Sequence, residues 1–551
     1  MSKTTTKKRI FIANDASILD TGYGVYGKEI ISRIHNSDKY TVAELGCYCD
    51  VNDHRIKNIP WKFYANAIGF NDPRVEQYKS NHLNQFGMWR FNRCLIDFKP
   101  HIVFDIRDYW MYFYQDMSPY RHHFNWIIMP TTDSNPPKID WLYTYQNAEL
   151  VVPYTQWAKD VLTNSCGNRI NLFPKIANAG INPNEFFPIE NKTAHKLKFF
   201  GKDLNIIGLV MRNQKRKLIA DMLIAFKNFL QALKDSNQLD IYEKTYLYLH
   251  TSYPEENGWD LPALLLEFDL LDKVYFTYRC KQCGHFHPSK FRGGISVCQK
   301  CNNRSVMMAS PSNGINTAQL NEIYNLFDIF IQYAICEGFG MPQVEAAACG
   351  LQIAAVDHSA MTEIVKNLNG IPIPVQKLFR EMEINADRAY PDNNFTSQML
   401  YNFFVNTSQS TKEENSKIIR EKCISLYTWD NVYKVWEEAF DSVDIDKKIP
   451  WDSKNVPQVQ NMSVKVPADL TNKEFIEFIC LKIINDPHLL KTANIQILIK
   501  ELTTGIVAKN GGMVNADRGY AIEVLESLIS NKINCERMRL DPNSIMKEDF
   551  I

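Results

Sequence analysis

Short apolar runs recur along the chain, and longer segments of mixed character separate them. The runs in the first part are predicted to be buried strands, at Arg9–Ala13, Thr41–Leu45, Ile102–Asp105, Trp126–Pro130 and Leu150–Val152. A second series is predicted at Asn205–Met211, Thr245–His250, Val274–Tyr278, Asp328–Ala334 and Gln352–Val356. Short strands that alternate with helical segments are typical of parallel α/β domains. The pattern therefore predicts two such domains, with ligands bound in a cleft outside the carboxyl ends of the strands.

Two polar stretches interrupt this pattern. A stretch rich in Lys and Asn near Phe187–Lys202 is predicted to link the two α/β domains. Beyond Pro450 the composition changes to a polar linker, and Leu470–Ile551 is predicted to form helices without a catalytic motif. A chain of 551 residues is too long for one hydrophobic core, which agrees with a division into several domains.

The composition is that of a globular protein without a dominant charge. Hydrophobic residues make up 45% of the chain, and 62 basic residues balance 62 acidic ones, so any polyanion site must be local. The apolar run near the start ends at Ala13, which is too short for a signal peptide, and no segment is long enough to span a membrane. Most of the 13 cysteines are scattered singly, as in a reducing compartment, which predicts a cytoplasmic protein.

Two glutamates carry the most specific chemistry of the chain. Glu337 and Glu345 lie in a glycine turn that follows a predicted strand, within the sequence CEGFGMPQVEAAACG. Pro342 suits the start of a helix and would put Glu345 in its first turn. The N–H groups at a helix N-terminus bind anions such as a diphosphate, and carboxylates accept hydrogen bonds from sugar hydroxyls. The alternative is an ordinary strand–helix junction whose glutamates cap or solvate the helix.

This segment resembles the E-x7-E signature of B-type glycosyltransferases, in particular family four, where it commonly reads EGFG-x-P-x-x-EA-x-A-x-G. The resemblance implies an α/β fold of two Rossmann-like domains, a UDP- or GDP-sugar donor, a retaining reaction and no catalytic metal. In that family the first glutamate contacts the donor sugar and the second contacts the ribose, roles that fall here to Glu337 and Glu345. Gly338, Phe339 and Gly340 would then also bind the donor.

A basic loop follows the first predicted strand of the second domain and contains Arg212, Arg216 and Lys217. Arginine offers a bidentate fork and lysine a point charge, a combination suited to a diphosphate. By the resemblance, Arg212 and Lys217 would hold the donor diphosphate, with Arg216 as a substitute if the register is shifted by one residue. A solvated charge cluster is the alternative, although cations at a helix start oppose the helix dipole.

A second glycine-rich segment, Thr21–Gly27, matches the pattern G-x-G-x-x-G, and Glu44 follows 20 residues after Gly24. This favours an NAD-type dinucleotide site, but eight residues separate the predicted strand from Gly22, whereas such a site needs its first glycine at the strand end. The resemblance instead implies that Gly22 and Gly24 face donor and acceptor across the cleft. A simple tight turn is a third interpretation.

Asp133 follows a predicted strand in IIMPTTDSNPP, which resembles a segment with proline and aspartate in some family-four members. It would point into the cleft and orient an acceptor hydroxyl or stabilise positive charge on the anomeric carbon, but an aspartate before prolines is also a common turn former. Asp105, Arg107 and Asp108, after the preceding predicted strand, are weaker candidates of the same kind.

The segment Asn178–Pro188 resembles the family's hinge-side motif HG-[VI]-D-x-x-x-F-x-P. Ala179 and Asn182 stand where that motif has histidine and aspartate. Those two groups are therefore absent or moved, which leaves the acceptor type open.

Four cysteines form two C-x-x-C knuckles, Cys280 with Cys283 and Cys298 with Cys301. Four thiolates at this spacing are typical of a structural zinc ribbon, with no coordination position left for catalysis. Its surroundings, Val274–Met308, contain six Lys or Arg and no Asp or Glu. A basic module beside an active site favours a polyanionic or nucleic-acid acceptor, whereas the alternative is a folding staple with solubilising lysines.

The acceptor itself has several interpretations. A general likeness to enzymes of large tailed phages favours a 5-hydroxymethylated pyrimidine in DNA, modified in a host cytoplasm. A glycan or glycolipid acceptor is the ordinary alternative. The non-enzymatic alternative is a nucleic-acid-binding protein that carries the zinc ribbon on an inactive transferase scaffold.

Pattern and resemblance together predict five parts. These are an acceptor domain at 1–190, a donor domain at 200–425, a zinc-ribbon insertion at 277–308, a crossover helix at 426–450 that returns to the first domain, and a helical accessory domain at 455–551.

Overall fold

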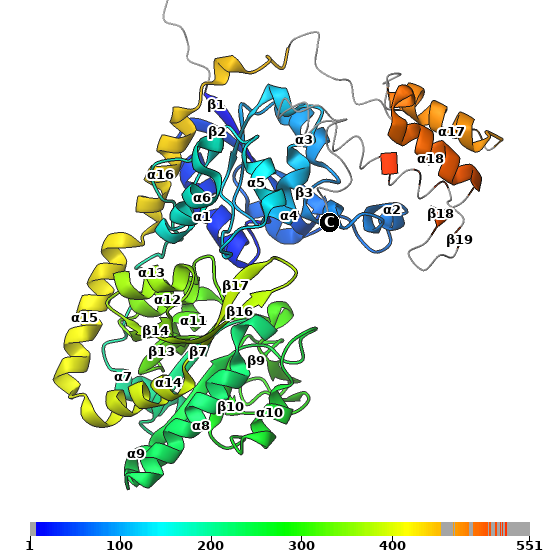
Figure 1. The fold of residues 1–551 in the computed structure, drawn as a ribbon. Helices are drawn as coiled ribbons and strands as arrows, with labels where there is room; N and C mark the ends of the chain where they lie inside the picture. Colours follow the sequence, from blue (N-terminus) through cyan, green and yellow to red (C-terminus); the bar gives the residue numbers. More distant parts are fainter. Residues whose placement is uncertain are drawn as a thin grey trace, which may run out of the picture. The chain divides into compact units, whose positions relative to one another are not determined.

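The chain forms two compact units, Met1–Ser453 and Lys454–Ile551. The computed structural model describes residues 7–452, 467, 469–483, 489–504, 506–507, 513–514, 518, 521 and 524–525. Within the first unit lie two parallel sheets, each covered by helices, which confirms the predicted α/β architecture (Figure 1). No helix in the described part of the chain is both long and apolar enough to cross a membrane.

The first sheet has the strand order β3-β2-β1-β4-β5-β6, and all its neighbouring strands are parallel. Its strands are β1 (Lys8–Asp15), β2 (Tyr40–Asp50), β3 (Lys62–Ala67), β4 (Ile102–Asp105), β5 (Asn125–Ile128) and β6 (Leu150–Val151). Its helices are α1 (Gly22–Asn36), α2 (Val75–Lys79), α3 (Phe91–Phe98), α4 (Tyr109–Tyr112), α5 (Ile139–Tyr145) and α6 (Gln156–Cys166). Ile10, Phe11 and Ile12 are fully buried, because β1 is central and covered on both faces.

The second sheet repeats this order as β9-β8-β7-β13-β14-β15, again with parallel neighbours. Its strands are β7 (Asn205–Val210), β8 (Thr245–His250), β9 (Val274–Cys280), β13 (Ile329–Gln332), β14 (Gln352–Val356) and β15 (Ile371–Ile373). The helices are α7 (Lys192–Phe200), α8 (Ile219–Asp235), α9 (Leu239–Lys244), α10 (Leu261–Glu267), α11 (Thr317–Tyr324), α12 (Met341–Ala348), α13 (Ala360–Asn367) and α14 (Asn393–Tyr401).

Close packing brings β7 beside β13. Gly208 of β7 pairs with Phe330, and a Cβ atom at Gly208 would lie 2.0 Å from the ring of Phe327. Only glycine fits this position without displacing the ring. The loops that follow β7 and β13 therefore start side by side, and these loops carry the basic residues and the glutamates.

Three antiparallel strands extend the second sheet beyond β9. They are β10 (Phe286–Lys290) and β12 (Arg304–Met308), which both pair with β9, and β11 (Ser296–Val297), which pairs with β12. The cysteine knuckles are thus part of an extension of the main sheet. A separate antiparallel hairpin, β16 (Val375–Glu381) with β17 (Ala386–Pro391), leaves the domain between β15 and α14.

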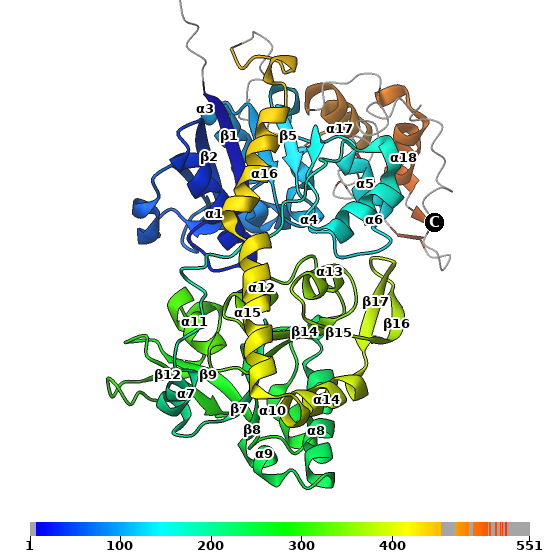
Figure 2. The ribbon, with the colours of Figure 1, turned by 90° about the vertical axis from the view of Figure 1, so that its left-hand side faces the viewer.

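Two successive helices, α15 (Gln409–Leu426) and α16 (Trp429–Ser442), carry the chain from the second domain back to the first (Figure 2). Trp436 of α16 donates its indole N–H to the hydroxyl of Tyr26, at 2.8 Å. The rings of Trp436 and Phe440 also pack against Phe104 of β4. The aromatic residues of the predicted crossover helix therefore serve packing.

The predicted linker at Phe187–Lys202 contains a helix instead. Lys196 of α7 is buried and holds the carboxylate of Asp328 with 2.7 Å to each oxygen, so its positive charge has a partner. Asp328 in turn accepts the N–H of Ile206 at 2.8 Å. Lys196 and Asp328 thus pack α7 against the amino ends of β7 and β13. A composition rich in Lys and Asn does not predict this packing.

The second unit has a small core of its own. It includes residues of α17 (Asn472–Phe478) and α18 (Ala493–Thr504), and the same unit contains the short antiparallel strands β18 (Ile506–Val507) and β19 (Met513–Val514). Phe475, Ile476 and Leu498 are among its buried residues. Most of the predicted accessory segment after 525, and the predicted linker at 455–466, lie outside the described residues.

Candidate active site at the domain interface

The turn after β13 holds a buried carboxylate between two cations. Lys217 forms an ion pair with Glu337, and Arg216 Nη1 lies 3.2 Å from the other oxygen of the same carboxylate. Gln332 donates its side-chain amide to Glu337 at 3.1 Å. The fold therefore brings Glu337 and the basic loop together, with Arg216 rather than Arg212 beside Lys217, and their roles toward a donor stay predictions.

The charge balance of this cluster decides its protonation. Burial by itself would raise the pKa of the Glu337 carboxyl, but Lys217 and Arg216 overcome burial and lower this pKa to about 2. Glu337 also raises the pKa of Arg216. The carboxylate and the guanidinium are both charged at neutral pH. With Lys217 protonated as well, two cations and one carboxylate leave a net positive charge, which suits an anionic ligand.

Two hydrogen bonds and one left-handed glycine fix the conformation of this turn. The N–H of Glu337 donates to the hydroxyl of Ser359 at 2.9 Å, and the N–H of Ile335 donates to the carbonyl of Arg216 at 2.9 Å. Gly340 has φ of 92°, a left-handed conformation that favours glycine, and it precedes α12 as the N-cap. Glycine offers no capping side chain, Pro342 has no N–H, and the N–H of Gln343 donates to the carbonyl of Gly340 at 3.0 Å. Among the first three residues of α12, the N–H of Met341 is therefore the one left to bind an anion.

Glu345 lies on α12, but one turn later than the sequence predicted. The helix begins at Met341, and its first turn contains no acidic residue. Tyr324 donates its hydroxyl to Glu345 at 2.6 Å. Burial raises the pKa of the Glu345 carboxyl to about 7, although the hydrogen bond from Tyr324 partly opposes this rise. Glu345 therefore changes its charge near neutral pH, in contrast to Glu337.

The basic loop divides into two parts. Arg212 is exposed and forms an ion pair with Glu255, away from Glu337. Lys217, the last residue of a short 3-10 turn at Lys215–Lys217, is buried and faces the carboxylate. Burial lowers the pKa of Lys217, and the nearby Glu337 opposes that effect. The pairing of Arg212 with a diphosphate stays a prediction, because its side chain would have to leave Glu255.

Glycines on both domains face one another at the interface. A Cβ atom at Gly22, the first residue of α1, would lie 3.9 Å from the sulfur of Met341, the first residue of α12. A Cβ atom at Gly338 would lie 2.6 Å from the methyl group of Thr131 in the first domain. The glycine loop of the first domain therefore lies opposite the glutamate turn. The N–H of Gly24 is used locally, because it donates to Thr21 at 3.0 Å.

Asp133 reaches the second domain. Cys336, the residue before Glu337, directs its thiol at Asp133 Oδ2 with 3.4 Å between sulfur and oxygen, and Ser134 donates to Asp133 Oδ1 at 2.7 Å. Asp108 lies nearby, where burial raises the pKa of its carboxyl to about 7, with the charge of Asp133 adding to the rise. Asp133 thus contacts the residue that precedes Glu337 in the chain.

Three other acidic or basic candidates have structural roles. Arg107 holds Asp105 through two hydrogen bonds, Nε to Oδ1 at 3.0 Å and Nη2 to Oδ2 at 2.6 Å, and both side chains are fully buried. Glu44 accepts hydrogen bonds from Ser17 and from the indole of Trp61 at 2.8 Å. The carboxylate that a dinucleotide site would offer to a ribose is therefore already occupied within the protein.

The four ribbon cysteines form a cluster of their own. The sulfur atoms of Cys280, Cys283, Cys298 and Cys301 all lie within 4.8 Å of one another. The side chain of Asn303 donates to the sulfur of Cys301 at 3.5 Å, and the N–H of Lys300 donates to that of Cys298 at 3.4 Å. This donor set is compatible with a tetrahedral metal ion. His285 and His287, which follow the first knuckle in the sequence, are not part of the cluster.

The ribbon knuckle and the glutamate turn share one edge of the sheet. Cys280 ends β9, and β9 is separated from β13 by β8 and β7. At about 4.8 Å between neighbouring strands, β9 and β13 run roughly 14 Å apart, and Cys280 lies further along its strand than the end of β13. The metal cluster is therefore beside the candidate site and takes no part in it.

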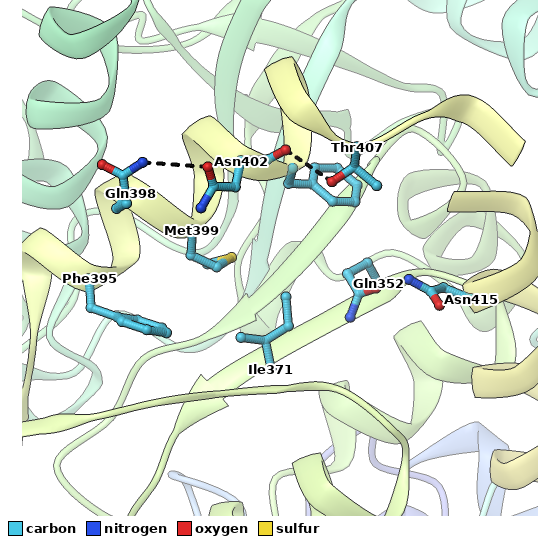
Figure 3. A pocket seen from close by; sticks show the side chains of 9 residues that line it. Gln352, Ile371, Phe395, Gln398, Met399, Asn402, Thr407 and Asn415 are labelled. Atoms are coloured by element: carbon cyan, nitrogen blue, oxygen red, sulfur yellow. Dashed lines mark hydrogen bonds between the residues drawn. The ribbon is translucent and has the colours of Figure 1, made fainter. Parts of the chain in front are cut away.

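A hollow of about 260 Å³ lies elsewhere on the second domain (Figure 3). Gln352 and Ile371, at the amino ends of β14 and β15, line it together with Met399 and Asn402. Ligands of parallel α/β sheets bind at the carboxyl ends of the strands, which is the opposite edge. This hollow does not belong to the candidate site.

Several residues of the site could not be identified from the sequence. Tyr324 contacts Glu345 across 21 residues of chain, and Ser359 contacts Glu337 across 22. Arg388, on β17, contacts Asp133 from 255 residues away. Arg216 could be identified from the sequence, as the residue that replaces Arg212 at the diphosphate if the register of the basic loop is shifted.

Residues 312–377, which include both glutamates, match the family model described as Glycosyl transferases group 1. Solved structures share the fold at low identity. Sucrose-phosphate synthase from Thermosynechococcus elongatus has 15% identity and a TM-score of 0.57, covering 80% of this chain and 100% of its own. A glycosyltransferase from Rickettsia africae has 13% identity and a TM-score of 0.53, covering 79% and 98%.

A third structure, HepE from Anabaena in complex with UDP and glucose, has 12% identity and a TM-score of 0.53, covering 80% of this chain and 100% of its own. No curated protein matches the chain. The chain therefore has the two-domain fold of these glycosyltransferases and carries a group 1 glycosyltransferase segment at its candidate site.

Proposed function

We propose that the protein is a glycosyltransferase that moves a sugar from a nucleoside diphosphate to an acceptor hydroxyl. The observation that carries this proposal is the buried cluster of Glu337, Lys217 and Arg216 at the start of α12. It lies inside the segment that matches group 1 glycosyltransferases. The structural neighbour HepE, which has been determined with UDP-glucose, supports a nucleotide-sugar donor.

The donor would bind along this cluster. Lys217, Arg216 and the N–H of Met341 at the start of α12 would hold the diphosphate, and Glu337 would accept hydrogen bonds from the sugar. Glu345 would accept hydrogen bonds from the ribose. Gly22, Gly24 and the turn Gly338–Gly340 would let the backbone approach the donor. Phe339 contributes through its backbone, because its buried ring stacks on Tyr154 at 5.3 Å.

The charges of these groups suggest the course of transfer. As the bond between the anomeric carbon and the phosphate oxygen breaks, its electron pair stays on the diphosphate, where Lys217 and Arg216 offset the growing charge. Glu337, with a pKa of about 2, has no proton to give and stabilises positive charge on the sugar. The acceptor oxygen bonds to the anomeric carbon. In a retaining reaction, which the family resemblance favours, its proton passes to a phosphate oxygen on the same face.

Replacement of donor-site residues tests this proposal. We expect Lys217→Ala and Glu345→Ala to lower nucleoside diphosphate release from the preferred UDP- or GDP-sugar by about a hundredfold, because each loses a charged contact to the donor. Lys215→Ala is the matched control, since Lys215 is exposed in the same turn. A panel of nucleotide sugars with purified, folded variants provides the measurement. Full activity in both donor-site variants would refute the donor assignment.

Donor binding should depend on pH through Glu345. Because its pKa is about 7, Glu345 is protonated below pH 7 and charged above it, and a carboxylate binds ribose hydroxyls more strongly than a carboxylic acid. We expect the affinity for UDP to rise about tenfold from pH 6 to pH 8, as the charged fraction rises. Calorimetric titration at several pH values measures this dependence.

Two variants control for the titration of UDP itself. Glu345→Gln should show weak binding without the tenfold change. Tyr324→Phe should move the change to higher pH, because the hydrogen bond from Tyr324 lowers the pKa of Glu345. The same pH dependence in Glu345→Gln as in the natural protein would exclude Glu345 as its origin.

The cysteine cluster would hold a structural zinc ion. Four thiolates fill a tetrahedral site, so the ion would stabilise the ribbon and leave no position for substrate. We expect about one zinc per chain by elemental analysis, with Cys280→Ser losing the metal and melting at a lower temperature. Cys94→Ser, at a buried cysteine of the first domain, should keep its zinc. Unchanged zinc content in Cys280→Ser would contradict the assignment.

The basic ribbon supports a polyanionic acceptor, and we propose 5-hydroxymethylated pyrimidines in DNA. Four of its cations, Lys281, Arg292, Lys300 and Arg304, are exposed, and none pairs with a carboxylate of the described residues. Only Lys290 has such a partner, Asp272 at 2.8 Å. Exposed cations without partners are available for phosphates.

Charge reversal on the ribbon tests the acceptor. With 5-hydroxymethylcytosine duplex DNA, the triple variant Lys281→Glu, Lys300→Glu and Arg304→Glu should raise the KM for DNA by about tenfold or more, most strongly at low salt. Donor hydrolysis without DNA should not change. The control reverses Lys202, Lys227 and Lys244, which are exposed on the same domain. Transfer to glycans but not to DNA, by mass spectrometry, would establish the alternative acceptor.

A further inference from the structure

The β16–β17 hairpin is a part of the second domain that makes contacts across the domain interface. It leaves the domain after β15, the last strand of the sheet, and returns before α14. Both ribbon views show it projecting toward the first domain (Figures 1 and 2). Most residues of β16 are exposed, whereas most residues of β17 are buried, and Arg388 in β17 has only 2% of its side chain exposed. A buried arginine requires partners for its charge.

The partners of Arg388 belong to both domains. Glu381, on the facing strand, accepts from Nε at 2.7 Å and so orients the guanidinium. Nη1 donates to the backbone carbonyl of Asp133 at 2.7 Å and lies 3.6 Å from its carboxylate, while Nη2 donates to Ser134 at 3.2 Å. Arg388 therefore holds backbone and side chain of the same loop in the first domain.

The backbone of β17 continues this bridge. The N–H of Asp387 donates to the carbonyl of Asn135 in the first domain at 3.2 Å. Two residues later, the N–H of Ala389 donates to the carbonyl of Ile335 in the second domain at 3.1 Å. Ile335 in turn bonds to the backbone of Arg216. One strand thus connects the loop of Asp133 with the segment that leads into Glu337.

The result is a fixed position for the Asp133 carboxylate. One of its oxygens is approached by Ser134 and Arg388, and the other by the thiol of Cys336. Cys336 precedes Glu337, so Asp133 lies against the donor turn itself. Without the hairpin, the loop of Asp133 would keep two of its contacts with the donor turn described above, that of Asp133 with Cys336 and that of Thr131 with Gly338.

We propose that Arg388, carried by the β16–β17 hairpin, is a positioning residue for sugar transfer that clamps the Asp133 loop onto the donor turn. This inference rests on the proposed function. Arg388 acts through Asp133, which would orient the acceptor hydroxyl or stabilise the anomeric carbon. Small displacements of such a group lower the rate of reaction without weakening donor binding.

Kinetics separate this role from donor binding. We expect Arg388→Ala to lower kcat for transfer by about tenfold or more, with the affinity for UDP within about twofold of the natural protein. Glu381→Gln keeps the arginine and the fold but removes the charge that orients it, so kcat should fall by an intermediate factor. Guanidinium ions should partly restore kcat in Arg388→Ala and not in Glu381→Gln.

Arg380 provides the matched control. It lies on the same hairpin and pairs with Asp387 at 3.0 Å, but it is exposed and makes no contact with the first domain. Arg380→Ala should leave kcat unchanged. A kcat equal to that of the natural protein in folded Arg388→Ala and Glu381→Gln, or an equal loss in Arg380→Ala, would overturn the positioning role.

Labelling of Cys336 tests the clamp independently of activity. Cys336 is 2% exposed beneath Asp133, so release of the loop should accelerate its reaction with N-ethylmaleimide, measured by peptide mass spectrometry. Burial raises the pKa of the Cys336 thiol, and Arg388 partly lowers it. Loss of Arg388 without any movement of the loop would therefore leave less thiolate and slow the labelling reaction. Faster labelling thus indicates that Cys336 has become more exposed. Cys94, in the core of the first domain, is the internal reference.

The two measurements distinguish the possible failures. Faster labelling together with a lower kcat supports the proposal. Unchanged labelling of Cys336 in folded Arg388→Ala refutes the clamp. A natural protein that transfers no sugar from any donor would refute the proposed function, and the role of Arg388 in transfer with it, while labelling would still decide whether the hairpin holds the loop.

Discussion

The candidate site depends on one buried ion cluster, Glu337 between Lys217 and Arg216. A carboxylate buried alone would be strongly unfavourable, so it requires both cations, and the cations require the carboxylate. The two partners come from loops more than a hundred residues apart in sequence. They meet because β7 and β13 are parallel neighbours whose carboxyl ends lie at one edge of the sheet. The close packing of Gly208 against Phe327 makes that neighbourhood possible.

The cluster also explains why two glutamates of one motif differ chemically. Glu337 has two cations beside it, and its pKa of about 2 keeps it charged. Glu345 has a neutral tyrosine as its partner, and burial raises its pKa to about 7. The first is suited to permanent electrostatic stabilisation and the second to binding that responds to pH. Their spacing in the sequence gives no sign of this difference, because it arises from the neighbours that the fold supplies.

Most strands of both sheets could be predicted from the sequence, because each is a short apolar run buried on two faces. β3, with the sequence KFYANA, was missed because it lies at the sheet edge and is only partly buried. The β16–β17 hairpin could not be predicted, because its strands, VQKLFRE and ADRAYP, are neither apolar runs nor regular alternations of polar and apolar residues. The sequence of α7 predicts a linker, because a lysine is usually exposed. Lys196 is buried in the fold only because Asp328, far away in the sequence, balances its charge.

The candidate site shows the same limit. Glu337, Glu345 and Lys217 were identified because motif and spacing reflect local backbone geometry. The choice between Arg212 and Arg216 depends on a single 3-10 turn, which directs Arg216 and Lys217 to the carboxylate and leaves Arg212 with Glu255. Partners such as Tyr324, Ser359 and Arg388 act through tertiary contacts. Such contacts cannot be read from one sequence without the fold.

The position of the cysteine ribbon has a consequence for the acceptor. Because β10 and β12 pair directly with β9, the ribbon is continuous with the sheet that carries the donor turn. It cannot move independently as a tethered module would. A polyanion bound to its exposed cations would therefore be held at a fixed distance from the donor turn. Rigid attachment of this kind raises the effective concentration of an acceptor at the donor more than a flexible linker does.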